Sequence, residues 1–194
     1  MEKEILAEKI VVYKNVIEDG MSIIKEIEEG FKSFGRTWGP SIIGDYREVN
    51  TDLRSCTILN LTPDPGDSKE FIKMKNDLDN KINKKIIKAL ADYNKTYGFQ
   101  TKSKEPWEVC RYEETQKLIW HKDNGPAHPC QVSYVLYFND DYEGGAIQFK
   151  DHLDGYPYQP LANSLVVFPS SEDFIHRVLP TTKGVRYAAI SFAL

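Results

Sequence analysis

The sequence lacks the features that mark membrane proteins and nucleic-acid-binding proteins. No stretch approaches the ~20 consecutive apolar residues that cross a bilayer, and no signal-like apolar run opens the chain. A net charge of −4 provides no positive field for nucleic acid or for an anionic membrane. We therefore expect no nucleic-acid partner and no membrane location.

Cysteine is also scarce. Cys56, Cys110 and Cys130 are an odd number at unrelated spacings, without a CxxC motif, so we expect neither a disulfide framework nor a cysteine-based zinc site. Unpaired cysteines favour a reducing, cytoplasmic compartment. The chain of 194 residues, 41% hydrophobic and 28% charged, is large enough to bury a core, and we expect a single domain over residues 1–194. Nothing in the composition favours a particular oligomeric state.

The first half, residues 1–100, predicts helices and loops. A short apolar run at 10–13 is typical of a strand. Apolar residues at three- and four-residue steps predict a helix over 21–34, ended by Gly35, and a longer helix over 67–98. The lysines that interleave with the second apolar stripe are expected to face solvent: Lys81, Lys84, Lys85 and Lys88.

Residues 36–66 have no periodicity and predict a long loop with one strand, at 55–61. Long loops in compact domains often carry binding residues. The aromatic and arginine residues of this loop, including the segment Asp45-Tyr46-Arg47, are therefore candidates for substrate contact. Arg54 is our first choice among them.

From Trp107 onward the pattern changes to short runs rich in valine, isoleucine, tyrosine and phenylalanine, separated by glycine and proline. This spacing predicts an antiparallel sandwich or barrel, with the two helices of the first half covering one face. The fold class is therefore mainly β with an α+β organisation. The expected strands cover residues 109–112, 118–121, 131–138, 146–150, 165–168, 175–178 and 186–193.

The second half also holds a candidate metal site. His121 and Asp123 are two residues apart where a strand opens into a turn, so their side chains share one face. His176, on a separate strand, supplies a third ligand. Two imidazoles and one carboxylate are the ligand set of an open ferrous site, although zinc accepts the same groups. His128 and His152 lack a matching partner and are expected at the surface.

The motifs around these residues resemble those of the iron(II)- and 2-oxoglutarate-dependent dioxygenases, most closely the prolyl 4-hydroxylase branch. Besides the HxD...H residues, the resemblance rests on residues 132–149, 165–169 and 179–187, which read VSYVLYFNDD...EGG...F, LVVFP and LPTTKGVRY. It implies a double-stranded β-helix (jelly roll) as the catalytic core over residues 107–194, with residues 1–100 as a helical support region.

The resemblance also implies roles for individual residues. His121, Asp123 and His176 correspond to the family's iron ligands. Arg186, ten residues after His176, corresponds to the basic residue that binds the far carboxylate of 2-oxoglutarate. Two tyrosines match active-site positions at the cosubstrate: Tyr137 and Tyr112. No catalytic side chain beyond the metal ligands is expected.

The activity implied is hydroxylation of proline residues in a peptide or protein, with iron(II), 2-oxoglutarate and dioxygen consumed to give succinate and carbon dioxide. Ascorbate is a further reagent that the resemblance implies. Two positions depart from the family pattern: Cys130 stands where related enzymes often have a substrate-contacting arginine, and Leu118 where they often have an aromatic residue. Candidates for substrate contact are Arg54, Trp120, Arg177, Asp140 and Asp141.

Two other functions remain open. The same iron core hydroxylates other amino-acid side chains or nucleobases in related chemistry, although the acidic composition disfavours a nucleobase. In a different class, the barrel is a non-catalytic, cupin-like module that binds a metal or a small ligand. Such a module has no need of Arg186 and Tyr137 beside three metal ligands.

Overall fold

The structure, a computed structural model, describes residues 2–42, 48–126 and 128–194. The segment Asp45-Tyr46-Arg47, a candidate for substrate contact, lies outside the described residues. Within them, no helix is both long enough and apolar enough to cross a membrane. The two helices are α1 (Gly20–Ser33) and α2 (Lys69–Tyr97), and two short 3-10 helices are η1 (Leu153–Gly155) and η2 (Glu172–Phe174). The strands are β1 (Glu2–Ala7), β2 (Ile10–Lys14), β3 (Gly39–Pro40), β4 (Thr57–Asn60), β5 (Glu108–Tyr112), β6 (Leu118–His121), β7 (Val132–Tyr137), β8 (Glu143–Gly144), β9 (Ile147–Phe149), β10 (Ser164–Pro169), β11 (His176–Val178), β12 (Thr181–Lys183) and β13 (Arg186–Ala193).

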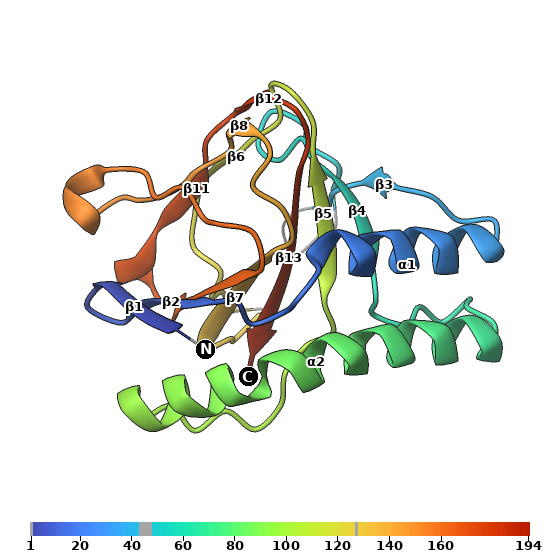
Figure 1. The fold of residues 1–194 in the computed structure, drawn as a ribbon, viewed down its shortest axis with the longest axis horizontal. Helices are drawn as coiled ribbons and strands as arrows, with labels where there is room; N and C mark the ends of the chain where they lie inside the picture. The colour runs from blue at the N-terminus through green and yellow to red at the C-terminus, as the bar shows by residue number, and fades with distance from the viewer. Residues whose placement is uncertain (1, 43–47, 127) are drawn as a thin grey trace.

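The strands form one large sheet and two small ones, and every pairing is antiparallel (Figure 1). The large sheet has eight strands in the order β1-β2-β10-β7-β13-β5-β4-β3. The small sheets are β6-β11-β9 and β12-β8. At the centre of the large sheet, from β2 through β10, β7 and β13 to β5, neighbouring strands are distant in sequence, as in a jelly roll. The expected mainly β architecture is confirmed.

Alternate residues of the central strands enter two different cores, which explains why these strands are buried on both faces. On β10, Leu165 and Val167 pack toward the helices. Val166 and Phe168 pack toward the small sheet, against Phe149 among others. The large sheet is therefore the middle layer, and the site described below lies on its small-sheet side.

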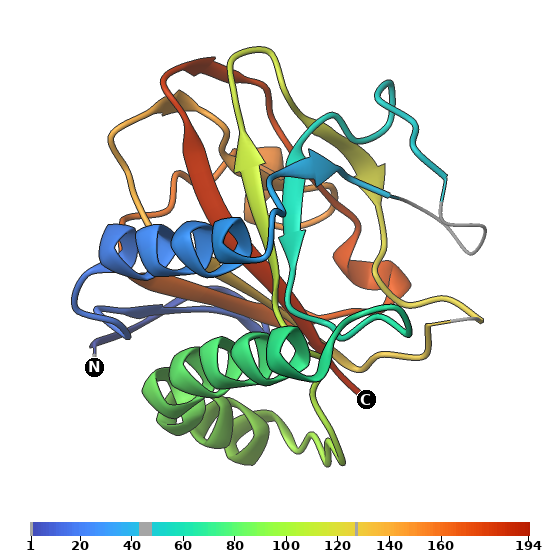
Figure 2. The same cartoon turned by 90° about the vertical axis from the view of Figure 1, so that its right-hand side faces the viewer.

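The two helices lie side by side on the other face of the large sheet (Figure 2). Asp19 caps α1 by accepting from Ser22 N. Ser68 caps α2, which ends at Gly98 in the left-handed conformation, with φ of 75°. Both helices and their ends were predicted, and the interleaved lysines of α2 are exposed as expected.

Two details differ from expectation. Met21 and Phe34, at the two ends of the predicted first helix, are 42% and 38% exposed, although Phe34 still packs on Phe71 with the ring centres 4.9 Å apart. The charged opening of the chain is strand β1, which pairs with β2 at the edge of the large sheet. Its alternating charges suit an edge strand, since they discourage pairing with another chain, but they hide the strand from an apolar pattern.

Candidate metal centre

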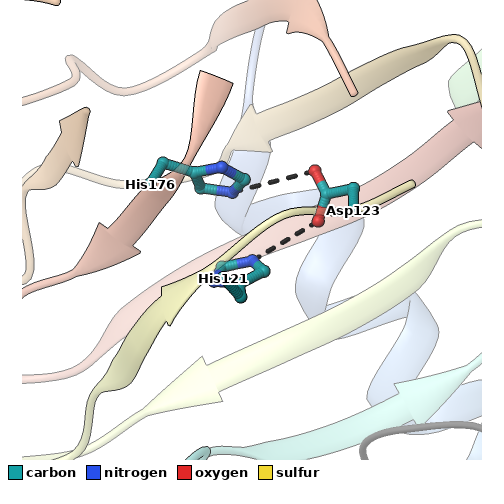
Figure 3. A group of neighbouring side chains, drawn as sticks. All are labelled: His121, Asp123 and His176. Atoms are coloured by element: carbon teal, nitrogen blue, oxygen red, sulfur yellow. Dashed lines mark ion pairs between the residues drawn. The ribbon is translucent and has the colours of Figure 1, made fainter. Parts of the chain in front are cut away.

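Three side chains from two strands converge on the inner face of the small sheet (Figure 3). His121 ends β6 and pairs directly with His176 at the start of β11. Asp123 follows β6 by two residues, and its two carboxylate oxygens lie 3.3 Å from His121 Nε2 and 3.7 Å from His176 Nε2. One donor atom from each residue lies within 4.8 Å of the others, so the predicted triad is brought together in a geometry that suits one metal ion.

Both imidazoles are oriented by the main chain. His121 Nδ1 lies 2.9 Å from the carbonyl oxygen of Ile119, and His176 Nδ1 lies 3.0 Å from that of Phe174. Because a carbonyl only accepts, each Nδ1 carries the proton and donates it. Each Nε2 therefore presents its lone pair toward Asp123, which is the tautomer that a metal requires.

The carboxylate of Asp123 is fixed from the opposite side. Ser133, on β7, donates a hydrogen bond to Asp123 Oδ2 at 2.6 Å, and its own oxygen lies 2.7 Å from Ser170 Oγ. Burial by itself would raise the pKa of Asp123, but the two histidines and Ser133 outweigh it and hold that pKa well below its usual range. Burial and the charge of His121 lower the pKa of His176 to about 4. At neutral pH the site thus holds an anionic carboxylate and a neutral imidazole, both competent as ligands.

A cavity opens beside this triad, inside the barrel. All six residues singled out from the sequence line it: Tyr112, His121, Asp123, Tyr137, His176 and Arg186. Arg186 opens β13 opposite Tyr112 on β5, while Ala188, two residues later, pairs with Tyr137. The guanidinium carbon of Arg186 lies 4.7 Å from the ring centre of Tyr112 and 5.0 Å from that of Tyr137.

Arg186 is a buried charge without an anion. It is 2% exposed, and its Nε and Nη1 have no hydrogen-bond partner among the described residues. The hydroxyl of Tyr137 is equally buried and equally without a partner in that part of the chain. Buried donors of this kind are costly unless a ligand satisfies them. The arrangement therefore fits a carboxylate, which a guanidinium and a phenol bind together.

Gly145 makes room for this arginine. It has a left-handed φ of 62°, and a Cβ atom at this position would lie 2.9 Å from Arg186 Cδ. The second glycine of the EGG motif thus has a local structural reason, the close approach of the turn after β8 to the arginine. The first, Gly144, lies against β12 and its approach, where a Cβ atom would lie 2.3 Å from the carbonyl oxygen of Pro180.

A wider groove leads from the triad to the surface. Arg54 lines both the cavity and the groove, and Trp120 lines the groove at 38% exposure. Arg177 stacks on Trp120, with its guanidinium carbon 4.4 Å from the ring centre. Arg54 and Trp120 therefore line the approach to the triad.

Other expectations need correction. Asp140 and Asp141 line neither the cavity nor the groove among the described residues; they accept hydrogen bonds from Ala162 N and Asn139 Nδ2 and fix the turn after β7. Cys130 is fully buried and lines neither space. It therefore cannot replace a substrate-contacting arginine.

His128, expected at the surface without a partner, is half-buried and links two segments. Its Nε2 lies 3.0 Å from Glu105, and its Nδ1 lies 3.1 Å from the carbonyl oxygen of Asp123. The other histidine expected at the surface, His152, lies 2.9 Å from the carbonyl oxygen of Asp173 and stacks on Phe174. Ser133 was not identified from the sequence. The available signal was its position as the one small polar residue in the otherwise apolar and aromatic strand VSYVLY.

Comparison with known proteins agrees with this geometry. The family model of the 2OG-Fe(II) oxygenase superfamily matches residues 107–193. A PKHD-type hydroxylase of Gloeothece citriformis is 36% identical over 88 residues, which cover 42% of this chain and 39% of the relative. One from Synechococcus sp. is 35% identical over 63 residues, covering 31% of this chain and 27% of the relative. The chain thus spans well under half the length of these curated relatives.

Solved structures share the fold over nearly the whole chain. A prolyl hydroxylase from Trichoplax adhaerens, in complex with a hypoxia inducible factor peptide fragment, has a TM-score of 0.71 at 16% identity, covering 96% of this chain and 83% of that one. A Pseudomonas putida prolyl-4-hydroxylase has a TM-score of 0.60 at 18% identity, covering 95% and 91%. Residues 107–193 of this chain therefore match the family model of the 2OG-Fe(II) oxygenase superfamily, and the chain shares its fold with prolyl hydroxylases.

Proposed function

We propose that this protein is an iron(II)- and 2-oxoglutarate-dependent dioxygenase that hydroxylates proline residues in peptides or proteins, with release of succinate and carbon dioxide. The observation that carries the proposal is the pairing, in one cavity, of a three-donor metal site with a buried arginine that lacks an anion. A module that only bound metal would leave that arginine unexplained, so a non-catalytic, cupin-like role is not favoured.

The donor set fits iron(II). His121, Asp123 and His176 would hold the ion through Nε2, a carboxylate oxygen and Nε2 respectively, on one side only. When bound, iron supplies the activation of dioxygen that no protein side chain provides. The residues of the chain contribute the orientation of the ligands and a cavity with apolar walls.

The far carboxylate of 2-oxoglutarate would be bound by Arg186 and Tyr137. Burial raises the pKa of Tyr137 to about 12, although the charge of Arg186 opposes this, so the hydroxyl remains protonated at neutral pH and donates. Arg186 offers a planar set of donors that suits a carboxylate. Tyr112, whose ring contacts the guanidinium, holds the arginine in place.

Proline as the target is supported by the relatives. The matched curated relatives are named PKHD-type hydroxylases, and two of the structural neighbours are a prolyl hydroxylase with a bound peptide and a prolyl-4-hydroxylase. The groove beside the metal site gives a peptide a route to it.

The setting and the reductant are further parts of the proposal. All three cysteines are buried free thiols, which supports a reducing, cytoplasmic setting. Ascorbate would keep the iron reduced.

The test is mass spectrometry of proline-containing peptides after incubation with iron(II), 2-oxoglutarate and ascorbate in air. We expect the mass of one added oxygen atom, localised to proline, with succinate formed in parallel. The His176→Ala variant should give neither product. Oxygen added to another residue would redirect the substrate class, and the absence of both products would contradict the proposal.

A further inference from the structure

The groove outside the metal site contains a charged pair that the proposed chemistry does not use. Arg54 Nη2 donates to Glu108 Oε1 at 2.6 Å, with 8% and 16% of the two side chains exposed. The same nitrogen also donates to Cys110 Sγ at 3.1 Å. Both charged residues line the groove. The cost of removing two charges from water can exceed the energy of their attraction, so a buried salt bridge is weak evidence of a contribution to stability. Stability alone therefore does not explain why the pair is present.

The strand register places Glu108 away from the cosubstrate, whereas Arg54 lies between the inner cavity and the groove. Along β5 and β13, Tyr112 pairs with Arg186 and Glu108 pairs with Ile190. Four residues of extended strand separate the two levels by ~13 Å. The Arg186 level accounts for the carboxylate of 2-oxoglutarate, so the Glu108 level is free for the substrate.

Arg54 has donors to spare. Of its guanidinium nitrogens, only Nη2 has a partner among the described residues, and Nε is buried without one. Arg54 as a whole is 7% exposed and lines both the inner cavity and the groove. The guanidinium of Arg54 is thus a buried donor with unused capacity, located where the inner cavity meets the groove. The carboxylate of Glu108, an acceptor, lies directly beside it.

The groove favours an uncharged ligand, because its arginine and lysine side chains already have carboxylate partners. Arg54 pairs with Glu108 and Lys122 with Glu172, and the carboxylate of Glu105 lies 3.0 Å from His128 Nε2. The remaining wall is largely apolar and includes Leu53, Pro106, Leu118, Ile119, Trp120 and Phe192. A free amino acid would have two charges without partners here, whereas a peptide segment has only its main-chain donors and acceptors.

We propose that the Arg54–Glu108 pair binds one main-chain peptide group of the substrate. Arg54 donates to the carbonyl oxygen, and Glu108 accepts from the N–H. This inference rests on the proposed function and adds how the substrate is recognised: through its main chain, with no charged side chain required at this point. Because proline has no N–H, the peptide group bound is not the one that precedes the target proline.

The experiment uses two probes that differ in one type of group. The first is an N-acetylated, C-amidated peptide of alternating proline and alanine. The second carries lactate in place of each alanine, so that an ester replaces each amide N–H. Binding of each probe to the manganese(II)-loaded, 2-oxoglutarate-bound protein is measured by calorimetry without oxygen, which makes the readout independent of turnover.

For the unmodified protein we expect the ester probe to bind on the order of tenfold more weakly than the amide probe, as for loss of one hydrogen bond to a charged group. In the Arg54→Met, Glu108→Leu double variant the two probes should bind alike. Removing both partners avoids an uncompensated buried charge, so this variant is expected to fold, which thermal unfolding checks. The Glu108→Ala variant provides a second, independent loss of the acceptor.

The matched control is Asp77→Asn, which removes a carboxylate from an exposed ion pair with Lys73 on α2. It should keep the full difference between the probes. An unchanged amide-to-ester ratio in both groove variants would overturn the inference, and so would failure of the unmodified protein to bind the amide probe. In either case 2-oxoglutarate binding and succinate formation are measured separately, so the proposed function stands or falls independently.

Discussion

Ser133 holds Asp123 by a 2.6 Å hydrogen bond to Oδ2, and the serine is itself held by Ser170. The bond occupies one oxygen of the carboxylate that Figure 3 shows facing both imidazoles. It therefore favours the other oxygen, Oδ1, as the one that ligates a metal. A single ligating oxygen leaves more positions on the metal for the cosubstrate and dioxygen.

Ser133→Ala should weaken the binding of divalent metal by about 10- to 100-fold, the usual effect of losing a partner that orients a ligand. Titration of the metal-free protein with manganese(II), followed by electron paramagnetic resonance, measures this. Ser133→Thr keeps the hydroxyl and should restore most of the affinity. An alanine variant with unchanged metal affinity would show that the hydrogen bond does not orient Asp123.

Arg186→Ala should weaken 2-oxoglutarate binding by roughly 2–5 kcal/mol, because the carboxylate would then be buried without its cation. Metal affinity should stay within about twofold, since the variant leaves the triad untouched. Separate titrations with manganese(II) and with 2-oxoglutarate distinguish the two effects. If the cosubstrate bound equally well to the variant, Arg186 would have another role.

Tyr137→Phe should have two effects of opposite sign. It removes a donor to 2-oxoglutarate and should weaken its binding by about 1 kcal/mol. It also removes a buried hydroxyl that has no partner among the described residues, so the cosubstrate-free protein should be more stable, by up to about 1 kcal/mol. Urea unfolding with and without 2-oxoglutarate measures both. A variant that is destabilised without the cosubstrate would contradict this account of the hydroxyl.

Lys75→Met should destabilise the fold without affecting the site. Lys75 is buried on α2, where it donates to Asp67 Oδ2 at 2.8 Å and to the carbonyl oxygen of Thr62 at 2.9 Å. Leaving these acceptors unpaired should cost roughly 2–3 kcal/mol in the free energy of unfolding. Lys73→Met, at an exposed ion pair two residues earlier, should cost well under 1 kcal/mol. Comparable losses in the two variants would contradict this reading.

Short-range rules explain only part of how the residues predicted for the metal and for the cosubstrate come together. The period of a strand puts His121 and Asp123 on one face, and both helices begin and end at their capping residues. The position of His176 beside them depends on the pairing of β11 with β6, which the family resemblance supplied and the spacing alone did not.

Other features depend on the register between distant strands and leave no local pattern. Arg54 meets Glu108 across 54 residues of sequence, and the link from His128 to Glu105 crosses between loops. Strand β1 was missed because its charges suit an edge and mask its period. Met21 and Phe34 follow the helical period but remain more than one third exposed at the ends of the helix. Periodicity shows which face of a helix is apolar, but not how far along the helix that face is buried.

An anaerobic titration tests most directly whether the triad and Arg186 together form a site for iron and 2-oxoglutarate. Adding 2-oxoglutarate to the iron(II)-loaded protein should produce a visible metal-to-ligand charge-transfer band, which His176→Ala abolishes and Arg186→Ala shifts to higher cosubstrate concentration. Admission of air should then yield succinate. If the unmodified protein showed no such band and formed no succinate in air, the account would be contradicted.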